Sequence, residues 1–163
     1  MNKDFYRKLH DFVMERSGLY KLVVWGVKLL PGIVYAAYPL LIGYLAIWHR
    51  TELLRGILVP AIGFLLVTGL RAWINAPRPY EAMGIPAITP KDTKGKSFPS
   101  RHAACGSVIA VTAIFTAPVL GWALLVISLL IALSRVLAGV HYIRDVTVGW
   151  LLGAGIGLLG FLN

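Results

Sequence analysis

Residues 123–137, ALLVISLLIALSRVL, carry no charge before Arg135 and form one of several long apolar runs in the chain. Runs that approach 20 apolar residues are typical of helices that cross a bilayer. Of the 163 residues, 58% are hydrophobic and 14% are charged, which is too few charges to cover the surface of a soluble domain. The runs are continuous and do not alternate with period two, which favours helices over a membrane β-barrel. We therefore expect an all-α, multi-pass helix bundle in the cell membrane, with a single domain over residues 1–163.

Five such runs predict five membrane spans, at about residues 29–48, 56–73, 101–116, 123–137 and 145–162. Before them, Phe5, Leu9 and Phe12 recur at helical spacing among basic side chains. This pattern predicts an amphipathic helix over residues 2–17 that lies on the membrane surface, and a mobile tail is the alternative. In the last span, the glycines at 149, 153, 157 and 160 predict close packing against neighbouring helices.

One long polar loop, at about residues 75–98, separates the second and third spans and contains Lys91, Asp92, Lys94 and Lys96. Because successive spans run in opposite directions, the N-terminus, this loop and the turn at 138–144 fall on one face of the membrane. The turns at 49–55 and 117–121 fall on the other face. The basic N-terminal segment favours a cytoplasmic location for the first face.

The formal net charge is +9, from 16 Lys and Arg against 7 Asp and Glu. In a soluble protein this excess would indicate nucleic-acid binding. Here the basic residues lie at span ends and in the loop, where they can meet anionic headgroups or a phosphorylated substrate. We therefore expect the bilayer and a lipid phosphate as partners, and no nucleic acid. The single cysteine, Cys105, excludes an internal disulfide.

The first polar cluster is RAWINAPRP, residues 71–79. Arg71 and Arg78 are seven residues apart and would share a face if one helix contained both, but Pro77 and Pro79 predict that the helix ends nearby. Two arginines that reach from a helix end to the membrane surface are the structural alternative to a binding role.

The second cluster is KSFPSRH, residues 96–102, at the start of the third span. Ser100 is suited to cap the helix, and the free backbone N–H groups of a first turn form an anion-binding site. Arg101 and His102 follow in that turn. A plain capped helix start would explain Pro99 and Ser100, but not an Arg-His pair entering an apolar helix.

The third cluster is SRVLAGVHYIRD, residues 134–145. His141 and Asp145 are four residues apart, so on one helical face the carboxylate would reach a ring nitrogen. Such a partner fixes the tautomer and raises the basicity of the other nitrogen, as a nucleophilic or base histidine requires. The alternative is that Asp145 caps its helix and pairs with Arg144. Arg135 precedes the histidine by six residues, and charges at membrane depth are usually functional.

A metal site is one alternative for these residues, because His102, His141 and Asp145 provide three ligands. Four nearby arginines would repel a cation and suit a bound dianion better, since the guanidinium fork matches phosphate oxygens. A second alternative is a transport or anion-binding membrane protein that uses the same arginines without turnover. The His141/Asp145 pair favours catalysis, because phosphate transport does not need it.

Together the three clusters resemble the three-part signature of the type 2 phosphatidic acid phosphatase (PAP2) superfamily of membrane phosphatases. That signature is a basic residue followed after six positions by Arg-Pro, then Pro-Ser-Gly-His, then Ser-Arg, five residues, His, three residues and Asp. Here it reads Arg71 with Arg78-Pro79, Pro99 to His102, and Ser134-Arg135 with His141 and Asp145. The resemblance covers residues 71–145, in the family's order.

The resemblance implies a metal-independent and cofactor-free phosphatase that acts on a lipid phosphate or pyrophosphate. It implies that His141 attacks phosphorus to form a phosphohistidine, that Asp145 orients His141, and that His102 protonates the leaving group and then activates water. The phosphate oxygens are then held by Arg71, Arg78, Ser100 and Arg135. Undecaprenyl pyrophosphate, phosphatidylglycerol phosphate and phosphatidic acid are candidate substrates, and members of this family commonly carry their site on the outer face.

Two positions depart from the family pattern. Arg71 replaces the usual lysine, which keeps the charge and changes its reach. Arg101 replaces the usual glycine and puts a bulky cation into the second motif, where it adds a phosphate contact, reshapes the headgroup pocket or points outwards.

Overall fold

The computed structural model describes residues 2–89 and 93–162, and every regular element in these two ranges is a helix. Lys91 and Asp92 of the predicted polar loop lie outside the described residues. The helices are α1 (Lys3–Met14), α2 (Ser17–Trp48), α3 (Arg50–Ile74), α4 (Pro79–Met83), α5 (Arg101–Thr116), α6 (Pro118–Leu137) and α7 (Ile143–Phe161). This architecture confirms the predicted all-α bundle.

Four helices, α2, α3, α6 and α7, are long and apolar enough to cross a membrane, and α5 is a shorter apolar helix of 16 residues. These five elements correspond to the five predicted spans. The chain is a multi-pass membrane protein. Two predicted turns are wrong in extent, since 49–55 shrinks to His49 and 117–121 shrinks to Ala117. Residues 50–55 favour helix, and Pro118 occupies the first turn of α6, where a proline is tolerated.

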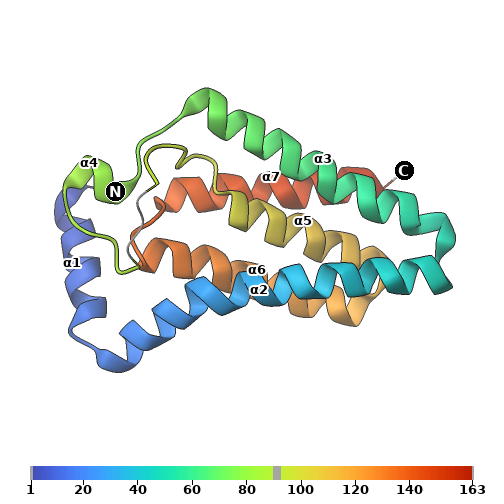
Figure 1. Cartoon of the computed structure of the whole chain (residues 1–163), viewed down its shortest axis with the longest axis horizontal. Helices are drawn as coiled ribbons and strands as arrows, with labels where there is room; N and C mark the ends of the chain where they lie inside the picture. The colour runs from blue at the N-terminus through green and yellow to red at the C-terminus, as the bar shows by residue number, and fades with distance from the viewer. Residues whose placement is uncertain (1, 90–92, 163) are drawn as a thin grey trace.

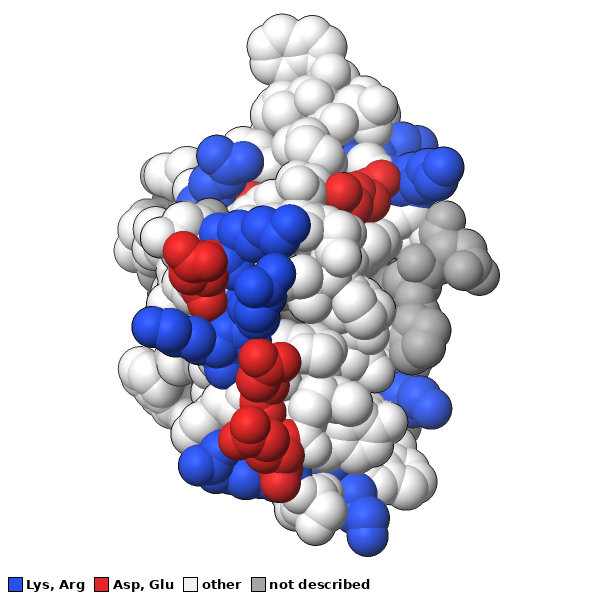
Figure 2. All heavy atoms as spheres, turned by 90° about the vertical axis from the view of Figure 1, so that its left-hand side faces the viewer, with Lys and Arg blue, Asp and Glu red and all other residues white. Residues whose placement is uncertain are grey.

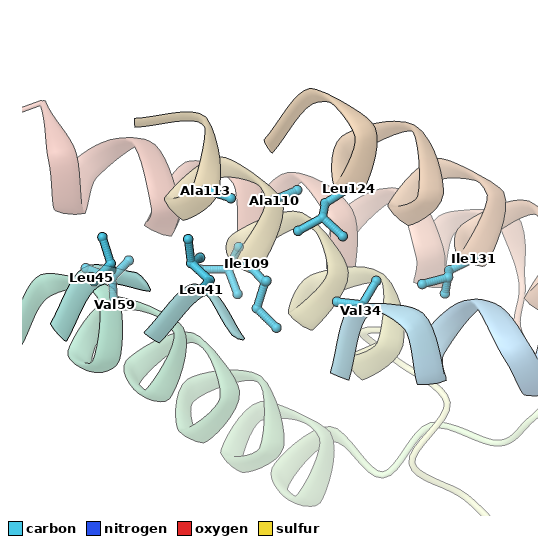
Figure 3. Packing of buried hydrophobic residues seen from close by; sticks show 10 residues of the cluster. Val34, Leu41, Leu45, Val59, Ile109, Ala110, Ala113, Leu124 and Ile131 are labelled. Carbon is cyan, nitrogen blue, oxygen red and sulfur yellow. The ribbon is translucent and has the colours of Figure 1, made fainter. Parts of the chain in front are cut away.

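The centre of the bundle is α5, which is buried on nearly every side and packs on α6, α7, α3 and α2. Figure 1 shows α2 and α3 diverging from their shared turn, with α5 lying between them. The main apolar cluster, shown in Figure 3, joins side chains of α2, α3, α5 and α6, including Val34, Leu41, Leu45, Val59, Ile109, Ala110, Ala113, Leu124 and Ile131. This core fixes the middle of α5 relative to its neighbours.

Glycines of α7 allow this helix to pack closely on α5 and α3. A Cβ atom at Gly149 would come within 2.5 Å of the Ser100 carbonyl oxygen, and one at Gly153 would overlap the Ala104 carbonyl. At Gly157 and Gly160 it would crowd valine side chains of α5 and α3, respectively. The predicted small-residue packing is therefore confirmed. It lets the Ser100 amide donate a 2.8 Å hydrogen bond to the Asp145 carbonyl, which ties the start of α5 to the start of α7.

The N-terminus, α1, α4 and the turn before α7 gather at one end of the bundle, as the alternation of spans predicts (Figure 1). Figure 2 views this end and shows basic and acidic side chains gathered in a band, with further charged side chains at its right-hand side. The 12 residues of α1 span about 18 Å, less than a bilayer core requires. Tyr6 and Val13 are buried, and the Tyr6 hydroxyl donates to the Gly139 carbonyl at 3.1 Å. The predicted amphipathic helix is confirmed and the mobile tail is wrong.

Candidate active site

A cavity of about 390 Å³ opens at this end of the bundle, between the last turn of α3, the first turn of α5 and the loop at 93–96. Five basic side chains line it, namely Arg71, Arg78, Lys94, Lys96 and Arg101. None of them makes an ion pair with an acidic side chain of the described residues. The cavity is therefore suited to an anion.

Arg71 and Arg78 reach the cavity from different elements. Arg71 lies in the last turn of α3, and Asn75 ends that helix in the left-handed region at φ 44°. Arg78 is the N-cap of the next helix, α4. The helix that contains Arg71 therefore ends before Arg78, as Pro77 and Pro79 predict. Arg71 Nη1 donates to the Pro99 carbonyl at 2.8 Å, and Arg78 donates to the carbonyls of Gly95 (3.0 Å) and Val140 (3.3 Å). Each guanidinium thus joins the first cluster to another one and keeps further N–H groups for a ligand.

The second cluster forms the start of α5. Ser100 occupies the N-cap position, but its side chain makes no capping hydrogen bond, and its buried Oγ has no hydrogen-bond partner among the described residues. The predicted N-cap position of Ser100 is therefore confirmed, although its side chain makes no capping hydrogen bond. Arg101 lines the cavity with its guanidinium carbon 5.4 Å from the centre of the Phe64 ring. His102 follows it in the first turn and is half-buried.

His141 lies in the turn between α6 and α7 and is 2% exposed. Its Nδ1 atom is 3.6 Å from Asp145 Oδ2. Because α7 begins only at Ile143, the two residues do not share a helical face, and that part of the prediction is wrong. The predicted proximity is confirmed, since the turn folds the ring back over the first turn of α7.

Ser97 connects the two groups. Its hydroxyl donates to Asp145 Oδ2 at 2.5 Å and lies 3.4 Å from His141 Nδ1, and its side chain is fully buried. The Ser97 amide donates to the Ala76 carbonyl at 2.9 Å, which holds the loop in place. The tautomer with the proton on Nδ1 directs this N–H at the Ser97 oxygen and the carboxylate and leaves the lone pair of Nε2 free.

Asp145 also caps its helix and lies near Arg144, as the alternative interpretation predicts. The Tyr142 amide donates to Asp145 Oδ2 at 3.1 Å, which caps the start of α7. Arg144 Nε lies 3.4 Å from Asp145 Oδ1, at ion-pair distance but without hydrogen-bond geometry, and the Arg144 side chain is largely exposed. The carboxylate thus contacts His141 and caps the helix at once.

The surroundings of His141 keep its ring neutral. Burial lowers the pKa of His141 to about 4, and the guanidinium groups of Arg78 and Arg71 act in the same direction, whereas the Asp145 carboxylate opposes them. A ring with this pKa is unprotonated at neutral pH and available as a nucleophile.

Arg135 does not line the cavity. It lies in the last turn of α6, is 3% exposed and donates from Nη2 to the Val27 carbonyl at 3.2 Å. Its Nε has no hydrogen-bond partner among the described residues. The structure therefore brings Arg71, Arg78 and Arg101 together in the cavity and places Arg135 against α2.

The metal alternative has no ligand set in the described part of the chain. No group of three or more His, Cys, Asp or Glu side chains within residues 2–89 and 93–162 is arranged to hold a metal ion.

The sequence pattern of the PAP2 superfamily matches residues 52–162, a range that contains all three clusters. The chain belongs to the PAP2 superfamily. The predicted enzyme class, a membrane phosphatase, is thereby confirmed. An undecaprenyl-diphosphatase of Sulfolobus acidocaldarius is 45% identical over 73 residues, which are 44% of this chain and 35% of that relative. Undecaprenyl-diphosphatase BcrC of Bacillus subtilis is 28% identical over 99% of this chain and 83% of its own length.

Two solved structures share the PAP2 fold of this chain. LpxE of Aquifex aeolicus superposes with a TM-score of 0.78 at 26% identity, over 99% of this chain and 95% of that protein. A PAP2-type phosphatidylglycerolphosphate phosphatase of Bacillus subtilis gives a TM-score of 0.73 at 23% identity, over 97% of this chain and 81% of that protein. The second likeness concerns the fold alone.

Two residues of this PAP2 site are missing from the sequence prediction. Ser97 lies in the quoted second cluster, but nothing in its local pattern indicates a contact with a residue 48 positions away. Glu81 accepts hydrogen bonds from the amides of Arg78 (2.8 Å) and Gly95 (2.9 Å), so it holds both sides of the cavity together. A glutamate three residues after Arg78 at a proline-led helix start is a capping-box signal that could have indicated this role.

Proposed function

We propose that this PAP2 protein removes the terminal phosphate from a lipid diphosphate of the undecaprenyl type, through a phosphohistidine on His141 and without a metal ion. The observation that carries the proposal is the environment of His141. The ring is buried beside Ser97 and Asp145, and burial together with Arg78 and Arg71, two arginines that line the cavity, keeps it neutral. A membrane protein that only binds phosphate has no need for such a histidine.

In the first step, Nε2 of His141 attacks the terminal phosphorus. The N–P bond forms while the P–O bond to the leaving group breaks, and His102 gives its proton to the leaving oxygen. Asp145 and Ser97 hold Nδ1–H and stabilise the positive charge that develops on the ring. Arg71 and Arg78 hold the oxygens of the transferred phosphoryl group, because phosphoryl transfer depends mainly on position and electrostatics.

In the second step, His102 takes a proton from water, which attacks the same phosphorus. The N–P bond breaks, orthophosphate leaves and neutral His141 is restored. In this proposal the Ser100 hydroxyl and the first amides of α5 bind phosphate oxygens, and Arg135 supports the site from behind by its charge and its contact with α2.

The choice of a lipid diphosphate has two supports. Both curated relatives are named undecaprenyl-diphosphatase, and one of them matches nearly the whole of this chain. The cavity also holds more cations than one phosphate group requires. Phosphatidylglycerol phosphate and phosphatidic acid are the competing substrates.

The test is phosphate release from these lipids in detergent. The purified protein should release phosphate from undecaprenyl diphosphate, also in EDTA, and His141→Ala should lose at least about 10³-fold in kcat, as expected for removal of a covalent nucleophile. The matched control is His49→Ala, because His49 is exposed and lies at the opposite end of the bundle.

Covalent trapping makes the test specific. Substrate labelled in the terminal phosphate should transfer an acid-labile, alkali-stable label to the protein, and not to His141→Ala. Unchanged turnover in His141→Ala would disprove the mechanism, and loss of activity on chelation would restore the metal alternative. Tight binding of the lipid without any turnover would favour a binding or transport protein.

A further inference from the structure

Arg101 differs from the other two arginines of the cavity in its surroundings. Arg71 and Arg78 both donate to carbonyls of neighbouring loops and both act on the charge state of His141. Arg101 instead lies over the ring of Phe64, at the side of the cavity that faces the middle of α3. The three cations therefore divide into a pair beside the nucleophile and a third cation at the other side of the cavity.

Phe64 also belongs to an apolar groove of about 410 Å³ between α2, α3 and α5. The groove is lined by Tyr35 and Tyr38 of α2, by Phe64 and Leu65 of α3, and by Cys105 and Ile109 of α5, among others. Tyr35, Phe64 and Leu65 are exposed, so the groove opens to the surroundings of the bundle. Its surface is almost entirely apolar, which suits a hydrocarbon chain.

Groove and cavity follow one another along α3. Phe64 and Leu65 line the groove, Thr68, Arg71 and Ala72 line the cavity, and Arg101 lies over Phe64 where the two meet. A lipid diphosphate whose chain occupied the groove would bring the phosphate bonded to the lipid to this junction. Its terminal phosphate would then lie further in, towards Arg71, Arg78 and His141.

We propose that Arg101 binds the inner phosphate of a lipid diphosphate and thereby makes the enzyme selective for diphosphates over monophosphates. The proposal rests on the proposed function. When the N–P bond to His141 forms, the bond from the terminal phosphorus to the bridging oxygen breaks, and the lipid monophosphate leaves with the electron pair. Arg101 stabilises the negative charge that develops on this leaving phosphate.

A lipid monophosphate gains nothing from this contact in the transition state. Its leaving atom is an alkoxide oxygen that depends on the proton from His102, and it has no second phosphate for Arg101 to bind. The glycine usual at this position of the second motif has no side chain that could contribute. Arg101 is thus a specificity determinant whose effect appears in the ratio of two substrates.

The experiment compares undecaprenyl diphosphate with undecaprenyl monophosphate, which share one lipid chain, in the full-length protein in detergent. The ratio of kcat/KM for the two substrates should fall about ten- to a hundredfold in Arg101→Gly, as expected when a charge-assisted hydrogen bond is lost. Arg101→Gln should lower the ratio in the same direction and guards against a folding defect of the glycine variant. Arg101→Lys should retain a larger part of the wild-type ratio, because the positive charge remains.

Arg50→Gly is the matched control. Like Arg101, Arg50 is the first residue of a helix, but it is exposed and lies at the opposite end of the bundle, so the substrate ratio should equal that of the wild type. A wild-type ratio in both Arg101→Gly and Arg101→Gln, with phosphate still released from the diphosphate, would overturn the role of Arg101 and leave the proposed function intact. If the wild type released phosphate from neither lipid, the proposed function would fall and the role of Arg101 with it.

Discussion

Ser97 Oγ lies 2.5 Å from Asp145 Oδ2, and both side chains are fully buried although 48 residues separate them in the chain. The same hydroxyl is 3.4 Å from His141 Nδ1, whereas the direct distance from His141 to Asp145 is 3.6 Å, longer than an ordinary hydrogen bond. Ser97 therefore completes the contact between the carboxylate and the ring. It is a positioning residue for His141, in addition to the residues of the three family motifs.

Ser97→Ala should lower kcat about ten- to a hundredfold and leave KM within about threefold, because the hydroxyl contacts the nucleophile's partner and not the cavity. The measurement is steady-state phosphate release at saturating and limiting substrate. Ser107→Ala is the matched control, since Ser107 is also fully buried and its hydroxyl donates to the Trp150 carbonyl at 2.8 Å, away from His141. Equal losses of kcat in the two variants would reduce Ser97 to a structural role.

The pH dependence should reflect the low pKa of His141, about 4. The neutral ring is the attacking form, so kcat/KM falls as the pH decreases through about 4, and this group causes no loss between pH 5 and 7. An ordinary histidine would produce that loss near pH 6.5. NMR titration of the ¹⁵N-labelled imidazoles, with His141→Gln to assign the signal, measures the pKa directly. A signal of His141 that titrates near 6.5 would contradict the buried, neutral nucleophile.

The sequence was sufficient to predict the spans and the three clusters because both depend on local patterns. Apolar runs determine which segments cross the membrane, and the spacing of Arg71, Ser100, His141 and Asp145 determines the family. The lengths of the turns are harder to predict from the sequence. Apolar runs do not fix where a helix ends: residues 50–55 favour helix and Pro118 is tolerated in a first turn, so α3 and α6 extend through both segments.

The contacts between clusters could not be predicted, because they depend on three-dimensional placement. The hydrogen bond from Ser97 to Asp145 requires backbone contacts to Ala76 and Asp145 that no local pattern encodes. For Arg135, the sequence predicts the motif position but not the direction of the side chain. Its motif position is correct, yet packing turns its Nη2 towards the Val27 carbonyl of α2 and not into the cavity.

Tyr6→Phe should loosen α1 from the turn that carries His141. The Tyr6 hydroxyl donates to the Gly139 carbonyl, two residues before His141, and its loss should cost about 1 kcal/mol of stability, or roughly 2–4 °C in Tm. Hydrogen exchange should become faster in α1 and in residues 138–142. Tyr20→Phe is the control, because Tyr20 is 37% exposed near the start of α2. Unchanged exchange in Tyr6→Phe would show that other contacts hold α1 in place.

Gly153→Ala and Gly155→Ala test the packing of α7 on α5 within one helix. A Cβ at position 153 would overlap the Ala104 carbonyl and the Ser107 hydroxyl, whereas one at position 155 would meet nothing within 4 Å. Gly153→Ala must push the helices apart and should cost about 1–3 kcal/mol. It should also lower activity, because the same contact aligns Ser100 with Asp145. Gly155→Ala should leave activity unchanged and stabilise the helix by about 0.5–1 kcal/mol, the conformational entropy that glycine loses in a helix.

Thermal unfolding in detergent measures the stability of both variants, and phosphate release on the same samples measures their activity. Equal Tm values for the two variants would mean that α7 can shift on α5 without cost, and the close approach at Gly153 would then not position the site.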